Sequence, residues 1–204
     1  MAIDTVIFDF DGVIAEPGFR LGLAQMSRPM DQPIEEIARQ GMRALLKSGY
    51  VTGLGSEAEF WQMLTVSINM DGNAAQLREA IISRSEIRQP MLRLIEKLRQ
   101  TGITVALLSD HTDWLDQIIT ANQLNDYFDY LFNSYHLHQC KRDPEVFDRV
   151  VKLVDAVPGQ TLFIDDNPDN VGRAISRGLN GIVYRDHQQL LTAMEGFGIP
   201  RKRP

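Results

Sequence analysis

The segment Thr5-Val6-Ile7-Phe8-Asp9-Phe10-Asp11-Gly12-Val13-Ile14 carries the most information about the fold and the function of this chain. Its β-branched and aromatic residues predict a buried strand, and two carboxylates one residue apart follow it. Because residues i and i+2 of a strand share a face, Asp9 and Asp11 lie close together unless the chain turns sharply between them. Two ionised carboxylates at the end of a buried strand repel each other, and a divalent cation such as Mg2+, which prefers oxygen ligands, is one remedy.

Four further short apolar runs resemble this first strand. They span residues 104–108, 130–133, 161–164 and 181–184. Such runs are typical of parallel strands that are covered on both faces. Apolar residues at helical spacing lie between and after them, within residues 91–98, 114–119, 146–154 and 171–179. The alternation of strands and helices predicts an α/β fold with a doubly wound parallel sheet.

The interval between the first two strands has a different pattern, because it lacks a convincing buried strand and reads as several helices. One helix opens at Pro33-Ile34, and another follows the capping box Ser56-Glu57-Ala58-Glu59. A further helix is indicated around residues 77–82. This interval predicts an inserted helical cap; the alternative is a second packed layer with no catalytic role.

The domain boundaries follow from that insertion. We expect an α/β core domain formed by residues 1–15 and 89–204, and a helical cap domain formed by residues 16–88. The hinges between the two are expected near Ala15–Gly18 and Arg84–Pro90.

The predicted strand ends bring polar side chains to one edge of the sheet, where ligands of open α/β sheets bind. Asp9 and Asp11 follow the first strand, Ser109 and Asp110 the second, and Asp165 and Asp166 the fourth, while Lys141 lies in the connection after the third. Taken singly, each residue type has an ordinary role in a turn or at a helix cap. Their convergence at two separate strand ends indicates a functional site instead.

Composition and charge exclude several other classes of protein. The chain has 204 residues and a net charge of -6, which argues against a broad nucleic-acid-binding surface. Cys140 is the only cysteine, so no intrachain disulfide is expected, in keeping with a reducing cytosol. No apolar run reaches the ~20 residues that span a membrane, and no secretory signal is indicated. We therefore expect a cytoplasmic protein without nucleic-acid or membrane partners; the sequence leaves its oligomeric state open.

The motifs at the strand ends resemble those of the haloacid dehalogenase-like (HAD) hydrolase superfamily, in the family's order and over nearly the whole chain. The matching segments are Asp9-Phe10-Asp11-Gly12-Val13, Ser109, Lys141 ahead of Asp143-Pro144-Glu145, and Asp165-Asp166. The insertion resembles the family's C1-type helical cap on a Rossmann-like core. The segment Asp165-Asp166-Asn167-x-x-Asn170 is similar to that of small sugar-phosphate phosphatases. Two departures stand out: Arg142 follows the lysine where the family often has proline, and Asp110 follows Ser109 where the family often has asparagine.

This resemblance implies a Mg2+-dependent phosphatase that hydrolyses a small phosphorylated metabolite through an aspartyl-phosphate. It assigns nucleophilic attack to Asp9, and to Asp11 the roles of general acid and then general base. The implied metal ligands are Asp9, the backbone carbonyl of Asp11, and Asp166 with help from Asp165. Ser109, Lys141 and backbone N–H groups near Gly12 would bind the phosphate, with Asp110 beside the substrate.

The resemblance also leaves alternatives open. A phosphomutase shares every core residue, and a non-catalytic HAD-like binding or regulatory protein is a further possibility. A dehalogenase is disfavoured because Asp11 is present, and a signalling receiver because the order of its motifs differs. Substrate selectivity is expected between Phe19 and Ile82, where the candidate contacts are Arg20, Arg28, Arg43, Phe60 and Trp61, although Trp61 better fits the core of the cap. His111, after the second strand, is a further candidate contact; the alternative is an ordinary role in the first turn of a helix.

Overall fold

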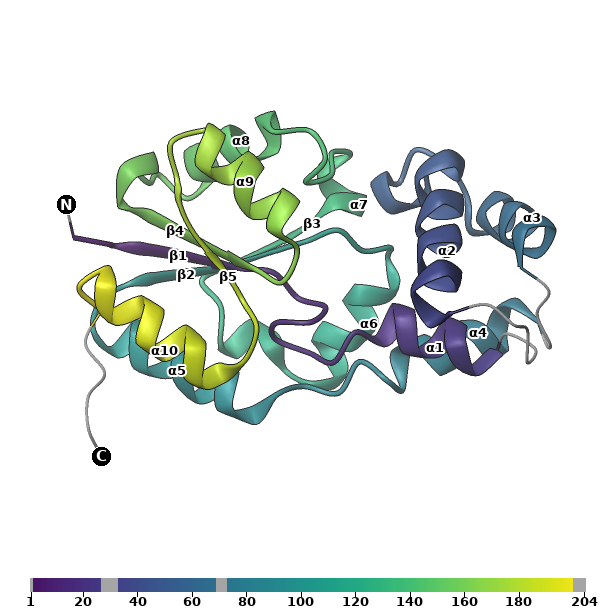
Figure 1. Ribbon diagram of the computed structural model, residues 1–204, viewed down its shortest axis with the longest axis horizontal. Coiled ribbons are helices and arrows are strands. Elements are labelled where there is room, and N and C mark those ends of the chain that lie inside the picture. The colour runs from purple at the N-terminus through teal and green to yellow at the C-terminus, as the bar shows by residue number, and fades with distance from the viewer. Residues whose placement is uncertain (1, 27–32, 69–72, 200–204) are drawn as a thin grey trace.

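Five parallel strands form one sheet in the computed structural model, which describes residues 2–26, 33–68 and 73–199 (Figure 1). The strands are β1 (Thr5–Phe8), β2 (Thr104–Ser109), β3 (Tyr130–Asn133), β4 (Thr161–Asp165) and β5 (Asn180–Val183). Their order is β3-β2-β1-β4-β5, and every pairing is parallel. This arrangement confirms the predicted α/β fold, and the ends of β2 to β5 differ from the expected ones by no more than one residue.

Helices cover both faces of this sheet because successive strand residues point to opposite sides. Val6 and Phe8 face one apolar cluster, to which α5 (Gln89–Gln100), α6 (Trp114–Ala121) and α10 (His187–Gly196) contribute. Ile7 faces the other cluster, to which α8 (Glu145–Leu153) and α9 (Pro168–Ser176) contribute. In Figure 1, α8 and α9 lie above the strands, and α5 and α10 lie below them. Among the described residues, no helix combines the length and the apolar character that crossing a membrane requires.

Short elements join these layers. They are α7 (Ser134–Leu137) and the 3-10 turns η1 (Tyr50–Thr52), η2 (Leu124–Asp126) and η3 (Pro158–Gln160). The apolar pattern of the sequence did not predict α7, which is only one turn long, or α10.

Ahead of α5, the described residues between β1 and β2 form four helices, which make up the insertion. They are α1 (Gly18–Met26), α2 (Ile34–Ser48), α3 (Glu57–Ser67) and α4 (Ala74–Ile82), and they lie beside the sheet (Figure 1). The helices expected from the sequence correspond to α2, α3 and α4, and the predicted capping box between Ser56 and Glu59 is present at the start of α3. The sequence did not predict α1. The division into a core domain and a cap domain at residues 16–88 stays a prediction.

The two chain segments that lead into and out of the insertion run side by side. Ala15 pairs with Ile87 in an isolated antiparallel bridge. The amide of Glu16 donates to the Glu86 carbonyl oxygen at 2.9 Å, and the amide of Arg88 donates to the Ile14 carbonyl oxygen at 2.9 Å. The segments expected to act as hinges are therefore hydrogen-bonded to each other.

A second junction between the insertion and the α/β part is centred on Trp114, the first residue of α6. Trp114 is buried within the apolar cluster of the insertion, where its ring contacts those of Tyr50 and Phe60 edge-on. The Tyr50 hydroxyl donates a hydrogen bond to Asp113, next to Trp114. The Ser134 hydroxyl donates to the Val51 carbonyl oxygen at 2.6 Å. The insertion is thus attached to the sheet layer at two separate places.

Candidate active site

Three acidic side chains meet where β1 and β4 end. The amide of Asp9 donates to the Ile164 carbonyl oxygen at 2.8 Å, which fixes the end of β1 against its neighbour. As a result, carboxylate oxygens of Asp9, Asp165 and Asp166 lie within 4.8 Å of one another. Oxygen donors of this kind are the ligands that Mg2+ prefers, so the cluster fits the cation that the sequence indicated.

Lys141 is fully enclosed in the same cluster. Its Nζ lies 2.6 Å from Asp9 Oδ1 and 2.8 Å from Asp165 Oδ2, and its side chain is 2% exposed. Burial alone lowers the pKa of the Lys141 amine, but the negative charges of Asp165 and Asp9 outweigh it and raise the pKa. Lys141 is therefore a permanent positive charge beside Asp9.

Asp9 is held at one of its two carboxylate oxygens. Oδ1 accepts hydrogen bonds from the Phe10 amide at 2.7 Å and from Lys141. Burial, followed by the charge of Asp165, raises the pKa of Asp9 well above 3.8, although Lys141 acts in the opposite direction. Both of these donors thus reach the same oxygen, Oδ1.

Asp165 and Asp166 differ in their surroundings although they are adjacent in the sequence. Asp165 is completely buried and accepts from the Asn167 amide, the Asn170 side chain and Lys141, at 2.8, 3.0 and 2.8 Å. Asp166 is exposed, and its pKa is raised by desolvation and by the charge of Asp165. Asp165 therefore anchors Lys141, while Asp166 presents its carboxylate to the site.

Asp11 departs from the cluster because the chain turns sharply after β1. The Phe10 carbonyl oxygen accepts from the amides of Val13, Ile14 and Ala15 at 2.9–3.2 Å, which closes a tight turn. The Asp11 side chain is not part of the carboxylate cluster. Burial raises its pKa, whereas the charge of His111 and the backbone N–H groups of Phe19 and Gly18, at the start of α1, lower it. Asp11 thus lies at the boundary between the sheet and the insertion.

Gly12 makes room for the acidic cluster. Its φ is +83°, and a Cβ at this position would lie 2.3 Å from Asp166 Oδ2. Its amide donates to the Ala15 carbonyl oxygen at 2.9 Å, and its carbonyl oxygen accepts from the Arg88 guanidinium, which also pairs with Glu16. The predicted contact of this backbone with phosphate stays a prediction.

The end of β2 supplies Ser109 and Asp110. Ser109 is buried, and Asp110 accepts from the backbone amide of Lys141 with Oδ1 at 2.9 Å and Oδ2 at 3.2 Å. Burial raises the pKa of Asp110, and the charge of Lys141 lowers it. The carboxylate that the sequence suggested as a substrate contact therefore holds the loop that carries Lys141.

Arg88 is a residue of the site for which the sequence gave no clear signal. Arg88 joins Gly12 to Glu16, and its position within an expected hinge gave no indication of that contact. His111, which the sequence placed after the second strand as a possible substrate contact, is buried, and its ring meets that of Phe10 edge-on.

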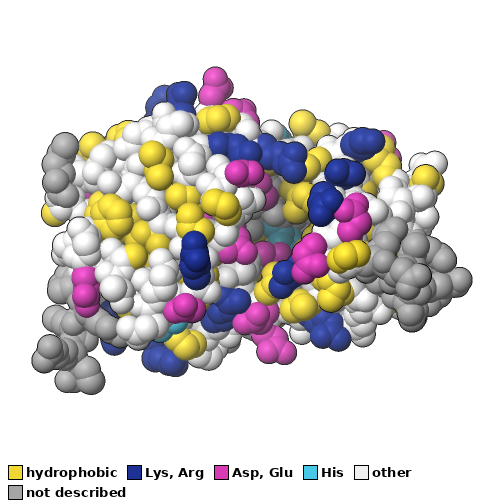
Figure 2. All heavy atoms as spheres, in the orientation of Figure 1, with side chains coloured by type: hydrophobic (Ala, Val, Ile, Leu, Met, Phe, Trp, Pro, Cys, Tyr) yellow, Lys and Arg dark blue, Asp and Glu magenta, His cyan; other side chains and the backbone are white. Residues whose placement is uncertain are grey.

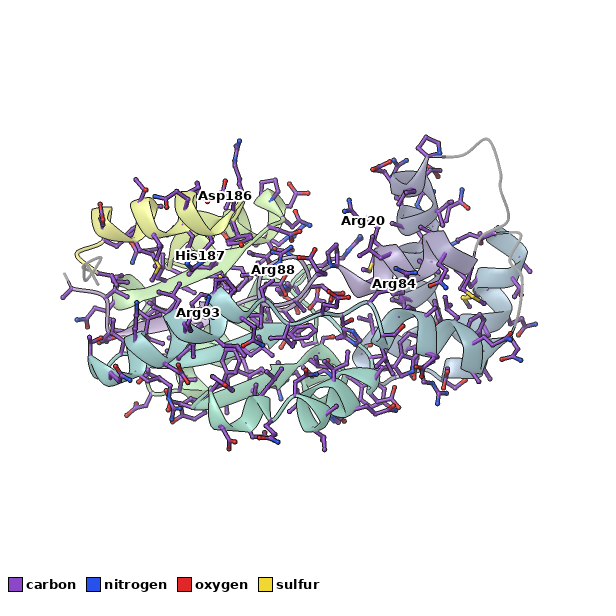
Figure 3. The ribbon with its side chains drawn as sticks, turned by 90° about the horizontal axis from the view of Figure 1, so that it is seen from below. Arg20, Arg84, Arg88, Arg93, Asp186 and His187 are labelled. Carbon is purple, nitrogen blue, oxygen red and sulfur yellow. The ribbon has the colours of Figure 1, made fainter. Side chains whose placement is uncertain are left out.

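The candidate substrate contacts in the insertion have different environments. Phe60 is fully buried, and Trp61 packs against the same apolar cluster. Arg20 and Arg43 are exposed, and Arg28 lies outside the described residues. Arg20 on α1 and Arg88 before α5 lie on the two sides of the junction between the insertion and the sheet (Figure 3).

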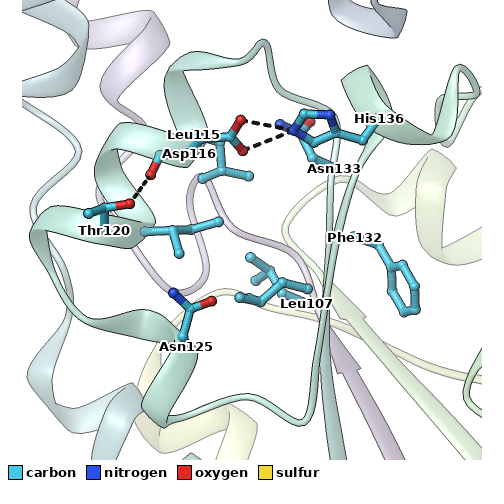
Figure 4. Close-up of a pocket in the computed structure, with 10 residues that line it drawn as sticks. Leu107, Leu115, Asp116, Thr120, Asn125, Phe132, Asn133 and His136 are labelled. Atoms are coloured by element: carbon cyan, nitrogen blue, oxygen red, sulfur yellow. Dashed lines mark hydrogen bonds and ion pairs between the residues drawn. The ribbon is translucent and has the colours of Figure 1, made fainter.

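The surface is hollowed at this junction. Figure 2 shows acidic side chains and a histidine side chain at the floor of the hollow, with lysine and arginine side chains and further acidic ones around its mouth. A separate pocket of about 230 Å3 lies between α6 and β3, where His136 Nε2 is 2.9 Å from Asp116 Oδ2 (Figure 4). None of the predicted site residues lines that pocket.

Comparisons with known proteins identify the family and the fold of this chain. A family model described as haloacid dehalogenase-like hydrolase matches residues 3–175. D-ribitol-5-phosphate phosphatase of Bacteroides thetaiotaomicron is 28% identical over 185 residues, which cover 83% of this chain and 85% of that protein. Bifunctional epoxide hydrolase 2 of Rattus norvegicus is 24% identical over 96% of this chain, and the match spans only 39% of that relative's length.

A crystal structure of a HAD family enzyme from Bacteroides thetaiotaomicron, in complex with magnesium and inorganic phosphate, has the same fold. The TM-score is 0.65 at 22% identity, and the match covers 92% of this chain and 98% of that one.

Proposed function

The chain belongs to the haloacid dehalogenase-like hydrolases, and from this premise we propose that it is a Mg2+-dependent phosphatase of a small phosphorylated metabolite. The observation that supports the proposal most directly is the buried contact between Asp9 and Lys141 inside a cluster of carboxylates. A related phosphatase of ribitol 5-phosphate and a neighbouring structure with magnesium and phosphate are consistent with this chemistry.

In the first step, Asp9 Oδ2 attacks phosphorus while the bond from phosphorus to the leaving oxygen breaks. Asp11 gives its proton to that oxygen, which departs as an alcohol. The result is an aspartyl-phosphate on Asp9. In the second step, Asp11 takes a proton from water, which attacks phosphorus and releases inorganic phosphate and the Asp9 carboxylate.

Charge neutralisation is the second requirement, because an anionic nucleophile approaches an anionic phosphate. Lys141 and the Ser109 hydroxyl offset the charge on the phosphoryl oxygens. Asp9, Asp166 and the backbone carbonyl of Asp11 would hold Mg2+, which supplies further positive charge when bound. The basic side chains around the hollow favour the arrival of anionic substrates on a protein of net charge -6 (Figure 2).

The insertion covers the leaving-group side of the hollow, so we assign substrate selectivity to its residues and to those it faces. The raised pKa of Asp11 suits a group that must carry a proton before it donates one.

Hydrolysis of p-nitrophenyl phosphate with and without Mg2+ tests the proposal. Asp9→Asn is expected to abolish turnover, and Asp11→Asn to bind Mg2+ normally but lose rate. Asp148→Asn, at an exposed carboxylate paired with Arg177, serves as the control and should keep full activity. Full activity of Asp9→Asn would refute the assignment, and transfer of phosphate within a substrate, without release of inorganic phosphate, would favour a phosphomutase.

A further inference from the structure

His111 has one ring nitrogen that the protein uses and one that it does not. Nδ1 lies 3.2 Å from the Thr112 carbonyl oxygen, which can only accept, so Nδ1 donates. Nε2 is buried and has no hydrogen-bond partner among the described residues. Leaving a buried polar atom unpaired destabilises a protein, so such an atom in a functional site calls for an explanation.

The surroundings of His111 hold it firmly in place. The residue is 5% exposed, and its ring meets that of Phe10 edge-on with centroids 6.3 Å apart. Its amide donates to Ser134 Oγ at 3.1 Å, and Ser134 in turn donates to Val51 of the insertion. The backbone and Nδ1 are therefore sufficient to fix the ring, and Nε2 is not needed for that purpose.

Asp11 also has a buried side-chain atom that the described part of the protein leaves without a hydrogen bond. Its Oδ1 is also buried and without a hydrogen-bond partner among the described residues. The ring of His111 meets that of Phe10, which directly precedes Asp11, and the charge of His111 lowers the pKa of the Asp11 carboxyl. Two buried atoms, one on each residue, are thus left for a ligand.

We propose that His111 is a substrate-binding residue, whose Nε2 hydrogen-bonds a hydroxyl group on the leaving alcohol next to Asp11. The proposal rests on the phosphatase function, in which Asp11 protonates the leaving oxygen. A group that reaches His111 beside Asp11 is therefore attached close to that oxygen. A hydroxyl suits Nε2 whether or not the ring is protonated, because a hydroxyl both donates and accepts.

The substrate class follows from this contact. The substrate is a phosphate ester of a polyhydroxylated alcohol or sugar, with a hydroxyl near the ester oxygen, rather than an aryl or simple alkyl ester. A site built to hydrogen-bond a substrate hydroxyl discriminates strongly against analogues that lack it.

The test compares kcat/KM for hydroxylated esters with that for a matched ester without hydroxyls. Glycerol 3-phosphate, ribose 5-phosphate and sorbitol 6-phosphate form the first group, and n-propyl phosphate, which has the carbon chain of glycerol, forms the second. The wild type is expected to prefer at least one hydroxylated ester. His111→Leu should lower that preference ~10-fold or more, while hydrolysis of n-propyl phosphate changes little.

Two further variants keep the test decisive. His111→Phe preserves a ring without nitrogens and should lose the same preference, which covers the case in which His111→Leu does not fold. His111→Gln retains a donor and an acceptor and should recover part of the preference. His136→Leu, which alters an exposed histidine in the separate pocket, should leave the preference unchanged.

The outcomes separate the two proposals. Suppose that the wild type hydrolyses p-nitrophenyl phosphate with Mg2+ but shows no preference for hydroxylated esters over n-propyl phosphate, or that His111→Leu and His111→Phe leave this preference unchanged. In either case the assignment of His111 is wrong and the phosphatase function stands. An equal loss with all substrates would also overturn it, because a substrate contact acts on one class only. No hydrolysis of p-nitrophenyl phosphate or of any of these hydroxylated esters, with Mg2+ present, would refute the phosphatase function itself.

Discussion

Replacing Gly12 by alanine is expected to weaken Mg2+ binding although Gly12 offers no side-chain ligand. The new Cβ would lie 2.3 Å from Asp166 Oδ2 and 2.8 Å from Asp166 Cγ. A normal contact between carbon atoms is about 3.5–4.0 Å, so the carboxylate has to move by about 1 Å. Metal sites tolerate only about 0.2 Å in ligand distances, so we expect Mg2+ affinity to fall ~10–100-fold, as it does when supporting residues of metal sites are altered.

Gly102 offers a matched control, because its φ of +84° is nearly the same as that of Gly12 and a Cβ there would meet nothing within 4 Å. Both alanine variants should lose roughly 1–2 kcal/mol of stability from the left-handed backbone. Only Gly12→Ala should lose Mg2+ affinity. Titration calorimetry measures that affinity, and urea denaturation in chelator measures the stability of both variants. Wild-type Mg2+ affinity in Gly12→Ala, or an equal loss in Gly102→Ala, would refute the reasoning.

Three further predictions concern the charges around Lys141. Lys141→Ala leaves Asp9 and Asp165 buried without their cation, so the free energy of unfolding in chelator should fall by about 3–5 kcal/mol. Mg2+ should restore part of that stability. An unchanged free energy of unfolding would contradict the buried pairing. Asp110→Ala should lower kcat because the Lys141 amide loses its acceptor, whereas Asp110→Asn keeps an acceptor oxygen and most of the rate; equal rates in both variants would remove that role. The raised pKa of Asp9 means that the folded state retains a proton that the unfolded state has lost above pH 3.8. Without metal, the wild type should therefore lose stability relative to Asp9→Asn as pH rises from 3.8 through the pKa of folded Asp9, and a relative gain in urea denaturation would contradict this sign.

The sequence predicted the sheet and the convergence of the site residues because each rests on a local pattern. Short apolar runs between helical segments indicate parallel strands, and the residues after such strands meet at one edge. This reasoning was sufficient to bring Asp9, Lys141 and Asp165 together. It did not show which carboxylate of the acidic pair is enclosed, because that depends on the donors that Asn167 and Asn170 supply.

The features that the sequence did not predict depend on tertiary contacts. Helix α1 has a weak apolar pattern because part of its packing face consists of glycine: a Cβ at Gly22 would lie 2.6 Å from the Ile81 side chain, and one at Gly18 would lie 2.0 Å from Ser85 Oγ. The separation of Asp11 from the acidic cluster depends on the turn at Phe10, which alternation along a strand cannot anticipate.

Trp114 has a consequence for how the molecule can be divided. Because this indole belongs to helix α6 but completes the apolar cluster of the insertion, amides of α2 and α6 should exchange with solvent in one cooperative opening rather than two. Excision of residues 16–88 would leave a large aromatic side chain uncovered on the remaining protein and promote its aggregation. An exchange of insertions between related enzymes therefore needs to carry the residue at position 114 along with the transplanted helices.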